Sequence, residues 1–245
     1  MNIAVIICAA GSSTRFGGKT KKIFEKVCET PVFLRSINVF SDIDDVKQII
    51  LAISPEDEEK IRMNWEANLA FDGVELCHGG SHRGETVEKA LANVRDEIDL
   101  VAVHDAARCC VTKEWVLEAF EKCSKSGAVA LACPVVSTIK KVVDGQIAET
   151  VDRINLYEAQ TPQVFNRTLL IDAYENIAKS DIDAKTITDD CSVVEKFGHA
   201  ISIVETDSSN IKITKKDDIS IAEAILKSRT KTEPKAFHPF ADDKW

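Results

Sequence analysis

The chain has 245 residues, of which 44% are hydrophobic and 29% are charged, and its formal net charge is −9. This length and apolar content allow one large α/β domain or two small ones, with enough apolar residues for a full core. The negative charge argues against general nucleic-acid binding, because a phosphate backbone needs a basic face on the protein.

The first predicted element is a buried strand. An uninterrupted apolar run rich in β-branched residues extends from Ile3 to Ala10, as in a central strand of a parallel sheet. Gly11 ends this run, and small polar residues follow it. The loop then carries the cations Arg15, Lys19, Lys21 and Lys22. Backbone N–H groups and cations after a buried strand are typical of a site that holds a polyanion.

Strands and helices then alternate as far as residue 133. The expected strands are Val46–Ile53, Val74–Cys77, Leu100–Val103 and Ala128–Cys133. The expected helices are 30–40 with Thr30 as its cap, one that opens at Ser54-Pro55, 84–94 and 113–125. Repeated β-α units predict an α/β fold with a single Rossmann-like, doubly wound and mostly parallel sheet. Ligand groups are expected at the carboxyl ends of its strands.

Residues 135–160 interrupt this alternation. Asp144-Gly145 lies between two β-type runs, 138–143 and 147–151, which predicts a β-hairpin. We expect a protruding arm that pairs with a second subunit. Helices 167–178, 189–197 and 216–227 and strands 200–204 and 211–213 follow. The expected organisation is a domain over 1–228 that carries the arm, and a polar tail over 229–245, mobile or docked on a partner.

Cysteine usage bears on the compartment. The eight cysteines are scattered, and no two of them have C-x-x-C spacing. The apolar start is too short to span a membrane and lacks the basic flank of a secretion signal. We therefore expect reduced, mostly buried thiols in a cytoplasmic protein that has no membrane partner.

The sequence matches neither of two common phosphate-binding motifs. GGKT at Gly17–Thr20 suggests a P-loop, but Ser13 stands where that motif requires its first glycine. No G-x-G-x-x-G is present either. A P-loop ATPase and a nucleotide-dependent dehydrogenase are therefore disfavoured.

The opening loop resembles a known signature. AAGSSTRFG with Lys22 is similar to the nucleotidyltransferase loop of the sugar-nucleotide pyrophosphorylase superfamily. From Ile3 to about Ala224 the chain resembles the 2-C-methyl-D-erythritol 4-phosphate cytidylyltransferase family. The further blocks are GGSHRGETV (79–87), VHDAAR (103–108), PVVSTIKKV (134–142), TVDR (150–153), AQTPQVF (159–165), TDDCSVVE (188–195) and NIKIT (210–214). Cys109 stands where the family usually has proline, and Ile23 where glutamine is common.

The resemblance implies a reaction. Such an enzyme joins the α-phosphate of CTP to the phosphate of a small polyol phosphate, with Mg²⁺, and releases pyrophosphate. The nucleophile is a phosphate oxygen, largely ionised at neutral pH because its second pKa is about 6, so no general base is needed. A ribitol-5-phosphate cytidylyltransferase is a close alternative, and a non-catalytic nucleotide-binding dimer is a third reading.

The resemblance also implies residue roles. Arg15 and Lys22 would stabilise the transition state. The nucleotide would be bound by Ala9, Ala10, Gly11, Gly79, Gly80, Ser81 and Thr86. The acceptor would be positioned by Asp105, Arg108, Thr138, Arg153, Thr161 and Lys212, with Asp105 also nearest the Mg²⁺. Thr138 and Arg153 lie in the arm, so they would act at the other subunit's site of a homodimer.

Several of these residues could instead have purely structural roles. Arg15 and Lys22 could form a solvated loop, the glycine pair an ordinary tight turn, and Arg153 an ion pair with Asp152. Thr86 could bond only within its own helix. His104 is expected to be a packed neighbour and Arg83 a structural tie for its loop. Lys19 and Lys21 are expected to be solvated cations. Thr188, Asp189 and Asp190 are expected to form a helix cap and an acidic first turn.

Overall fold

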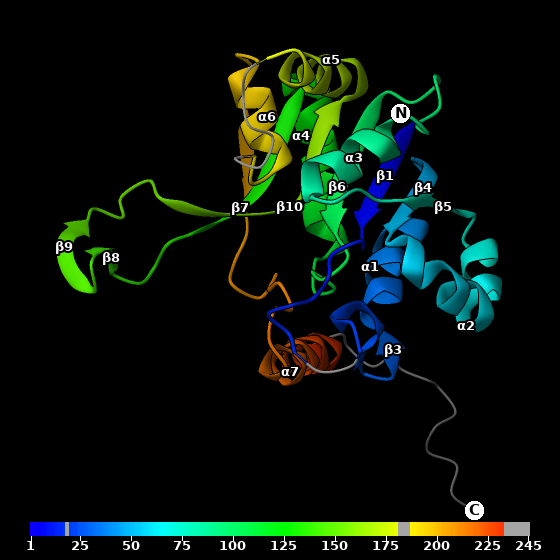
Figure 1. Ribbon diagram of the computed structural model, residues 1–245, viewed down its shortest axis with the longest axis horizontal. Helices are drawn as coiled ribbons and strands as arrows, with labels where there is room; N and C mark the ends of the chain where they lie inside the picture. Colours follow the sequence, from blue (N-terminus) through cyan, green and yellow to red (C-terminus); the bar gives the residue numbers. More distant parts are fainter. Residues whose placement is uncertain (18–19, 181–186, 233–245) are drawn as a thin grey trace, which may run out of the picture.

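The computed structural model describes residues 1–17, 20–180 and 187–232. Its centre is a seven-stranded sheet in the order β11-β7-β10-β6-β1-β4-β5 (Figure 1). The strands are β1 (Ile3–Cys8), β4 (Val46–Ile53), β5 (Val74–His78), β6 (Leu100–Asp105), β7 (Ala128–Pro134), β10 (Tyr157–Asn166) and β11 (Ser202–Glu205). Strand β10 runs antiparallel to both of its neighbours, whereas the other neighbouring pairs are parallel.

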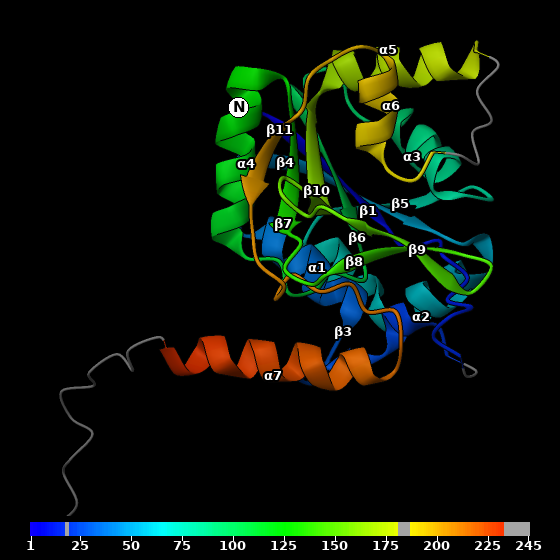
Figure 2. The ribbon, with the colours of Figure 1, turned by 90° about the vertical axis from the view of Figure 1, so that its left-hand side faces the viewer.

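Helices cover both faces of this sheet (Figure 2). Side chains alternate along β1, so Val5 packs with α1, α2 and α4 on one face, and Ile6 packs with α3, α5 and α6 on the other. These helices are α1 (Val32–Ser41), α2 (Glu58–Phe71), α3 (Arg83–Leu91), α4 (Lys113–Ser126), α5 (Arg167–Ala178) and α6 (Asp190–Lys196). The predicted doubly wound α/β class is confirmed.

Strand β1 lies where the winding of the sheet reverses direction. From β1 the chain builds outward through β4 and β5, and it then crosses back to place β6 on the other side of β1. Cys8 at the end of β1 pairs in register with Ala52 of β4 and with Asp105 of β6. Ligands of doubly wound sheets bind at such a reversal, outside the carboxyl ends of the strands.

The predicted hairpin is present and extends away from the body of the protein (Figure 1). It consists of β8 (Ile139–Val143) and β9 (Gln146–Val151), joined by Asp144 and Gly145. Both turn residues have positive φ, 52° and 79°, as a tight two-residue hairpin turn requires. Pairing of this arm with a second subunit remains a prediction.

A third layer lies beyond the carboxyl ends of the strands, where α7 (Asp217–Thr232) packs beside the short pair β2 (Lys26–Val27) and β3 (Thr30–Pro31). Val27, Cys110 and Ile213 form a small apolar cluster with this helix. Helix α7 was expected to end at Lys227, so the first four residues of the predicted tail are helical. The rest of that tail, 233–245, lies outside the described residues.

Three elements differ from the sequence-based expectations. Strand β10 was not predicted, because the Thr161-Pro162 pair interrupts its pattern and proline is unusual within a sheet. The strand expected over 211–213 is wrong, since this segment has no strand partner; the Ile213 N–H instead donates to the Ala107 carbonyl at 2.9 Å. The helix expected from Thr30 begins at Val32, because Thr30-Pro31 pairs with β2.

The thiols agree with the prediction. All eight cysteines lie within the described residues and are free, and five of them are buried. No helix among the described residues is both long enough and apolar enough to cross a membrane.

Candidate active site

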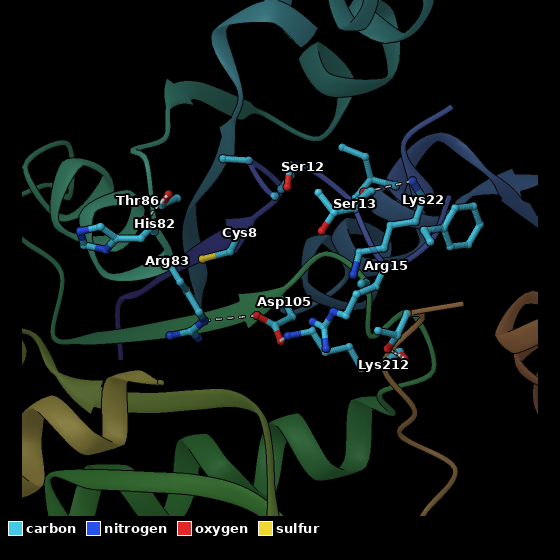
Figure 3. A pocket seen from close by; sticks show the side chains of 18 of the residues that line it. Cys8, Ser12, Ser13, Arg15, Lys22, His82, Arg83, Thr86, Asp105 and Lys212 are labelled. Atoms are coloured by element: carbon cyan, nitrogen blue, oxygen red, sulfur yellow. Dashed lines mark hydrogen bonds and ion pairs between the residues drawn. The ribbon is translucent and has the colours of Figure 1, made fainter. Parts of the chain in front are cut away.

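A cavity of about 360 Å³ opens at the carboxyl ends of β1 and β6 (Figure 3). The predicted site residues that line it are Ala9, Ala10, Gly11, Arg15, Lys22, Gly80, Ser81, Thr86, Asp105 and Lys212. They come from the loops after β1, β5 and β6 and from the segment before α7. The predicted residues Gly79, Arg108, Thr138, Arg153 and Thr161 are not part of its lining.

The loop after β1 is folded so that Lys22 faces the cavity. Ser13 adopts a positive φ of 56°, and its hydroxyl accepts a hydrogen bond from the Lys22 N–H at 3.3 Å. Lys22 begins the short 3₁₀ helix η1 (Lys22–Phe24), whose next two residues, Ile23 and Phe24, are buried in the core. Ile23, a departure from the family pattern, therefore anchors the lysine from below.

Lys22 is in an unusual environment for an ammonium group. Its Nζ donates to the Ile213 carbonyl at 2.9 Å, and it lies near Lys212 and Arg15 (Figure 3). Burial and the neighbouring Lys212 lower the pKa of Lys22 to about 8. Phosphate groups would relieve this repulsion, so the arrangement suits an anionic ligand.

The lowered pKa of Lys22 predicts that kcat/KM for CTP falls at alkaline pH. The ammonium form of Lys22 is present below pH 8 and is lost above it, so kcat/KM for CTP should fall as the pH rises through about 8. Lys22→Arg should move this limb to higher pH, because a guanidinium stays charged. The measurement is kcat/KM for CTP between pH 6 and 10 for both proteins. An unshifted alkaline limb in Lys22→Arg would mean that another group titrates.

Arg15 is exposed and forms no ion pair with any residue that the structure describes. Its guanidinium lies on the same side of the cavity as Lys22 and Lys212 (Figure 3). A forked donor without an internal partner is available to phosphate oxygens.

The opposite wall is built from the loop after β5. The backbone passes so close to the β1 loop that a side chain at Gly79 would overlap Ala10. The Gly80 N–H donates to the Thr86 hydroxyl at 3.0 Å, and that hydroxyl donates to the His82 carbonyl at 3.0 Å. Thr86 is thus engaged within its own loop and helix start, as its structural alternative described, although it also lines the cavity.

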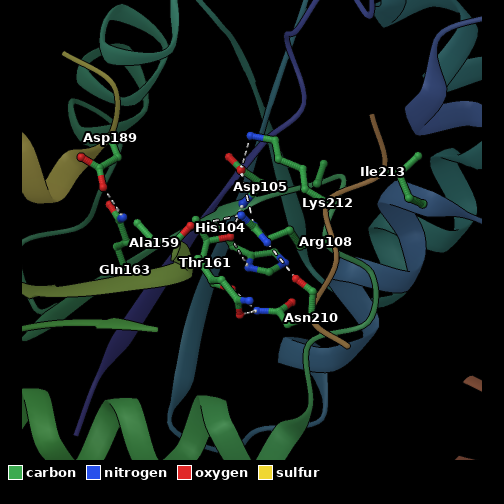
Figure 4. A network of polar contacts seen from close by, with 12 residues as sticks. His104, Asp105, Arg108, Ala159, Thr161, Gln163, Asp189, Asn210, Lys212 and Ile213 are labelled. Carbon is green, nitrogen blue, oxygen red and sulfur yellow. Dashed lines mark hydrogen bonds and ion pairs between the residues drawn. The ribbon is translucent and has the colours of Figure 1, made fainter. Parts of the chain in front are cut away.

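Asp105 is the carboxylate at the centre of the site. Its oxygens lie 2.6 Å from Lys212 Nζ, 3.4 Å from Arg83 Nε and 3.9 Å from Arg108 Nε (Figures 3 and 4). Burial alone would raise the pKa of Asp105, but Arg83, Lys212 and Arg108 outweigh burial and hold it well below its usual value. Asp105 is therefore an anion across the physiological pH range.

Buried polar contacts support Asp105 from below (Figure 4). The Thr161 hydroxyl accepts from the Asp105 N–H at 3.0 Å and bonds His104 Nδ1 at 3.1 Å. His104 packs against Phe40, and its burial lowers its pKa to about 3, so it is neutral. The interpretation of His104 as a packed neighbour is confirmed, and Thr161 is placed beneath the carboxylate.

Arg108 is held by the chain around it. Its guanidinium donates to the Asn210 carbonyl at 2.7 Å and to the Ala159 carbonyl at 3.3 Å. These contacts tie the loop after β6 to β10 and to the segment that carries Lys212.

The arm residues lie apart from this cavity. Arg153 donates to the Val136 carbonyl, and the Asp152 carboxylate accepts from the Ile154 N–H at 3.0 Å. The alternative ion pair of Arg153 with Asp152 is not formed within the described residues. Thr138 is exposed.

The basic residues Lys19 and Lys21 were both expected to be solvated. Lys21 is not solvated, because its Nζ pairs with Glu56 at 2.5 Å and with Asp57 at 2.7 Å. No local pattern pairs Lys21 with these two residues, which lie in the short 3₁₀ helix η2 (Pro55–Asp57) after β4. Lys19 lies outside the described residues.

Arg83 was expected only to tie its loop, yet it lines the cavity and contacts Asp105. Its second partner is Asp190, at 2.7 Å, whereas the expected cap role belongs to Asp189, whose carboxylate accepts from the Ser192 N–H at 3.0 Å. No local signal could have paired Arg83 with a residue so distant in the sequence.

The fold and the cavity together indicate the general class of protein. A doubly wound α/β sheet with a cation-lined cavity at its reversal point is typical of proteins that bind phosphorylated ligands. A family model matches residues 3–228, and its description is 2-C-methyl-D-erythritol 4-phosphate cytidylyltransferase. The chain belongs to this family.

Individual relatives have the same name as the family model. The chain is 36% identical over 234 residues to the Bacillus licheniformis 2-C-methyl-D-erythritol 4-phosphate cytidylyltransferase, covering 95% of this chain and 99% of the relative. It is 39% identical over 229 residues to the protein of that name from Endomicrobium trichonymphae, covering 93% and 100%.

Solved structures give the same result. The 4-diphosphocytidyl-2C-methyl-D-erythritol synthase of Anaerococcus prevotii is similar with a TM-score of 0.78 at 29% identity, covering 92% of this chain and 98% of that one. The Francisella tularensis 2-C-methyl-D-erythritol 4-phosphate cytidylyltransferase is similar with a TM-score of 0.77 at 32% identity, covering 92% and 100%.

Proposed function

We propose that this protein transfers the cytidylyl group of CTP to 2-C-methyl-D-erythritol 4-phosphate. The products are 4-diphosphocytidyl-2-C-methyl-D-erythritol and pyrophosphate, in the non-mevalonate route to isoprenoid precursors. The observation that carries this proposal is the convergence of Arg15, Lys22 and Lys212 on one cavity at the ends of β1 and β6. Family membership supplies the identity of the two substrates.

The chemistry needs positioned cations rather than a base. The attacking group is a phosphate oxygen that is already ionised near neutral pH, and the neutral, buried His104 is not placed to take a proton. Arg15 and Lys22 stabilise the charge that develops at the α-phosphate of CTP. Lys212 pairs with Asp105 and would turn to the acceptor phosphate when the acceptor binds.

The residues that line the cavity offer Mg²⁺ one carboxylate ligand. Asp105 is the carboxylate that lines the cavity, and among the described residues no group of three or more His, Cys, Asp or Glu could hold a metal ion. A hard cation that takes its other ligands from phosphates and water matches one protein carboxylate. Bound there, Mg²⁺ would neutralise phosphate oxygens and orient the triphosphate.

The arm over 135–160 is proposed to form a homodimer. Its exposed apolar residues support this, since Val142, Ile147 and Ile154 have 56%, 66% and 73% of their surface accessible. Thr138 and Arg153 would then reach the partner's site to position the acceptor. In this organisation residues 1–228 form the nucleotidyltransferase domain, and the eight free cysteines support a cytoplasmic location.

The test is pyrophosphate release from CTP and Mg²⁺ with each acceptor supplied separately. We expect turnover with 2-C-methyl-D-erythritol 4-phosphate and at least about a hundredfold lower kcat/KM with ribitol 5-phosphate. Turnover with ribitol 5-phosphate alone would overturn the choice of acceptor. Absence of turnover with either would favour a nucleotide-binding protein without transferase activity.

A further inference from the structure

We propose that Asp190 and Arg83 form a positioning pair for Asp105: buried Asp190 holds Arg83, and Arg83 fixes one oxygen of the Asp105 carboxylate while the other oxygen exchanges partners. The pair would act on binding of the acceptor. This inference rests on the proposed function.

Arg83 bridges two carboxylates from different layers. It is the first residue of α3, and its side chain reaches Asp105 across the floor of the cavity (Figure 3). Its Nη1 lies 2.7 Å from Asp190 Oδ2, and its Nε lies 3.4 Å from Asp105 Oδ1. The shorter contact is with Asp190, so Asp190 is the partner that holds the guanidinium in place.

Asp190 is itself fixed by neutral groups. It has no accessible surface, its Oδ1 accepts from the Tyr174 hydroxyl at 2.6 Å, and its N–H donates to Gln163 Oε1 at 3.0 Å. A buried carboxylate is stable only with a paired charge and hydrogen bonds, and Arg83 supplies that charge.

The two oxygens of Asp105 have different partners. Oδ1 faces Arg83, whereas Oδ2 faces Lys212 at 2.6 Å and Arg108 at 3.9 Å. When an acceptor phosphate attracts Lys212, Oδ2 loses its closest cation. Arg83 cannot follow the phosphate because Asp190 holds it, so the carboxylate keeps its charge and its orientation. Oδ2 is then free for the acceptor hydroxyls or the metal.

Loss of the Asp190 charge changes this balance. Arg83 Nη2 is buried and has no hydrogen-bond partner among the described residues. Without Asp190, the guanidinium has Asp105 as its nearest carboxylate, and its free donors can turn onto both oxygens. Asp105 would then compete poorly for the acceptor, whereas the backbone that contacts the nucleotide would be unchanged.

The test compares Asp190→Asn with Tyr174→Phe. The first removes the charge, and the second removes a hydrogen bond to the same carboxylate but leaves the charge. We expect Asp190→Asn to raise the KM of the acceptor about ten- to a hundredfold while the KM of CTP stays within about twofold. Tyr174→Phe should lower the melting temperature and leave both KM values unchanged. Calorimetric binding of the acceptor to enzyme loaded with a methylene-bridged CTP analogue gives a second readout.

An Arg83→Met background separates positioning from general destabilisation. If Asp190 acts through Arg83, adding Asp190→Asn to Arg83→Met should raise the acceptor KM no further. Equal kinetic profiles for Asp190→Asn and Tyr174→Phe, or a loss of CTP binding as large as that of acceptor binding, would overturn the positioning pair. A wild-type protein that turns over no acceptor would instead refute the proposed function.

Discussion

Replacing Lys22 by alanine is expected to lower kcat about 10²- to 10³-fold while changing the Kd of CTP less than about fivefold. The reason is that Lys22 lies in the cavity beside Lys212 and Arg15, with a pKa lowered to about 8. A repelled ammonium gains most from the extra negative charge that appears on the α-phosphate during transfer. Steady-state turnover and calorimetric titration with CTP measure the two quantities.

The neighbouring Lys21 provides a matched control. It is one residue away, but it pairs with Glu56 and Asp57 and does not line the cavity. Lys21→Ala should lower the melting temperature and leave kcat within about twofold. If Lys22→Ala weakened CTP binding as much as it lowered kcat/KM, Lys22 would be a binding residue and not a stabiliser of the transition state.

Mixing two inactive variants is expected to restore activity. Arg15→Ala and Arg153→Ala are each expected to be inactive alone, but a mixed dimer contains one site with both arginines if the arm acts in trans. Random exchange between twofold-symmetric dimers makes half of the dimers mixed, so about a quarter of the wild-type activity should return. Activity is measured after the two proteins have been co-refolded or allowed to exchange subunits.

The control for this experiment uses two residues of the same subunit. Arg15 and Lys22 both belong to the loop after β1 and line one cavity, so a mixture of Arg15→Ala and Lys22→Ala contains no intact site. That mixture should stay inactive. Failure of the Arg15→Ala and Arg153→Ala mixture to recover, in a sample shown to contain mixed dimers, would place Arg153 outside the partner's site.

Much of the fold follows from local patterns. The buried run at Ile3 predicts β1, and the Asp144-Gly145 turn predicts the hairpin, because each depends on residues close together in the sequence. Strand β10 cannot be predicted from such local patterns. Its pairing with β6 and β7 is set by tertiary contacts that override a proline in its middle.

The features of the site also divide into those that local sequence patterns predict and those that they do not. The loop residues Arg15 and Lys22 can be placed from sequence, because the end of a buried parallel strand is where ligands bind. The ion pairs of Lys21 with Glu56, of Arg83 with Asp190 and of Asp105 with Lys212 cannot be placed in this way, since each joins segments far apart in the chain. The family resemblance names residues but not these contacts. Only the folded chain shows that Lys21 has a structural role and that Asp105 is held between three cations.

The most direct test of the account follows the α-phosphorus of CTP. CTP labelled at that atom is incubated with the protein, Mg²⁺ and 2-C-methyl-D-erythritol 4-phosphate, and the products are separated. We expect the label to pass into a cytidine diphosphate ester of the acceptor and the released pyrophosphate to be unlabelled. Label recovered only in CTP or in CMP would contradict it, because the cations of the cavity would then not be joining two phosphates.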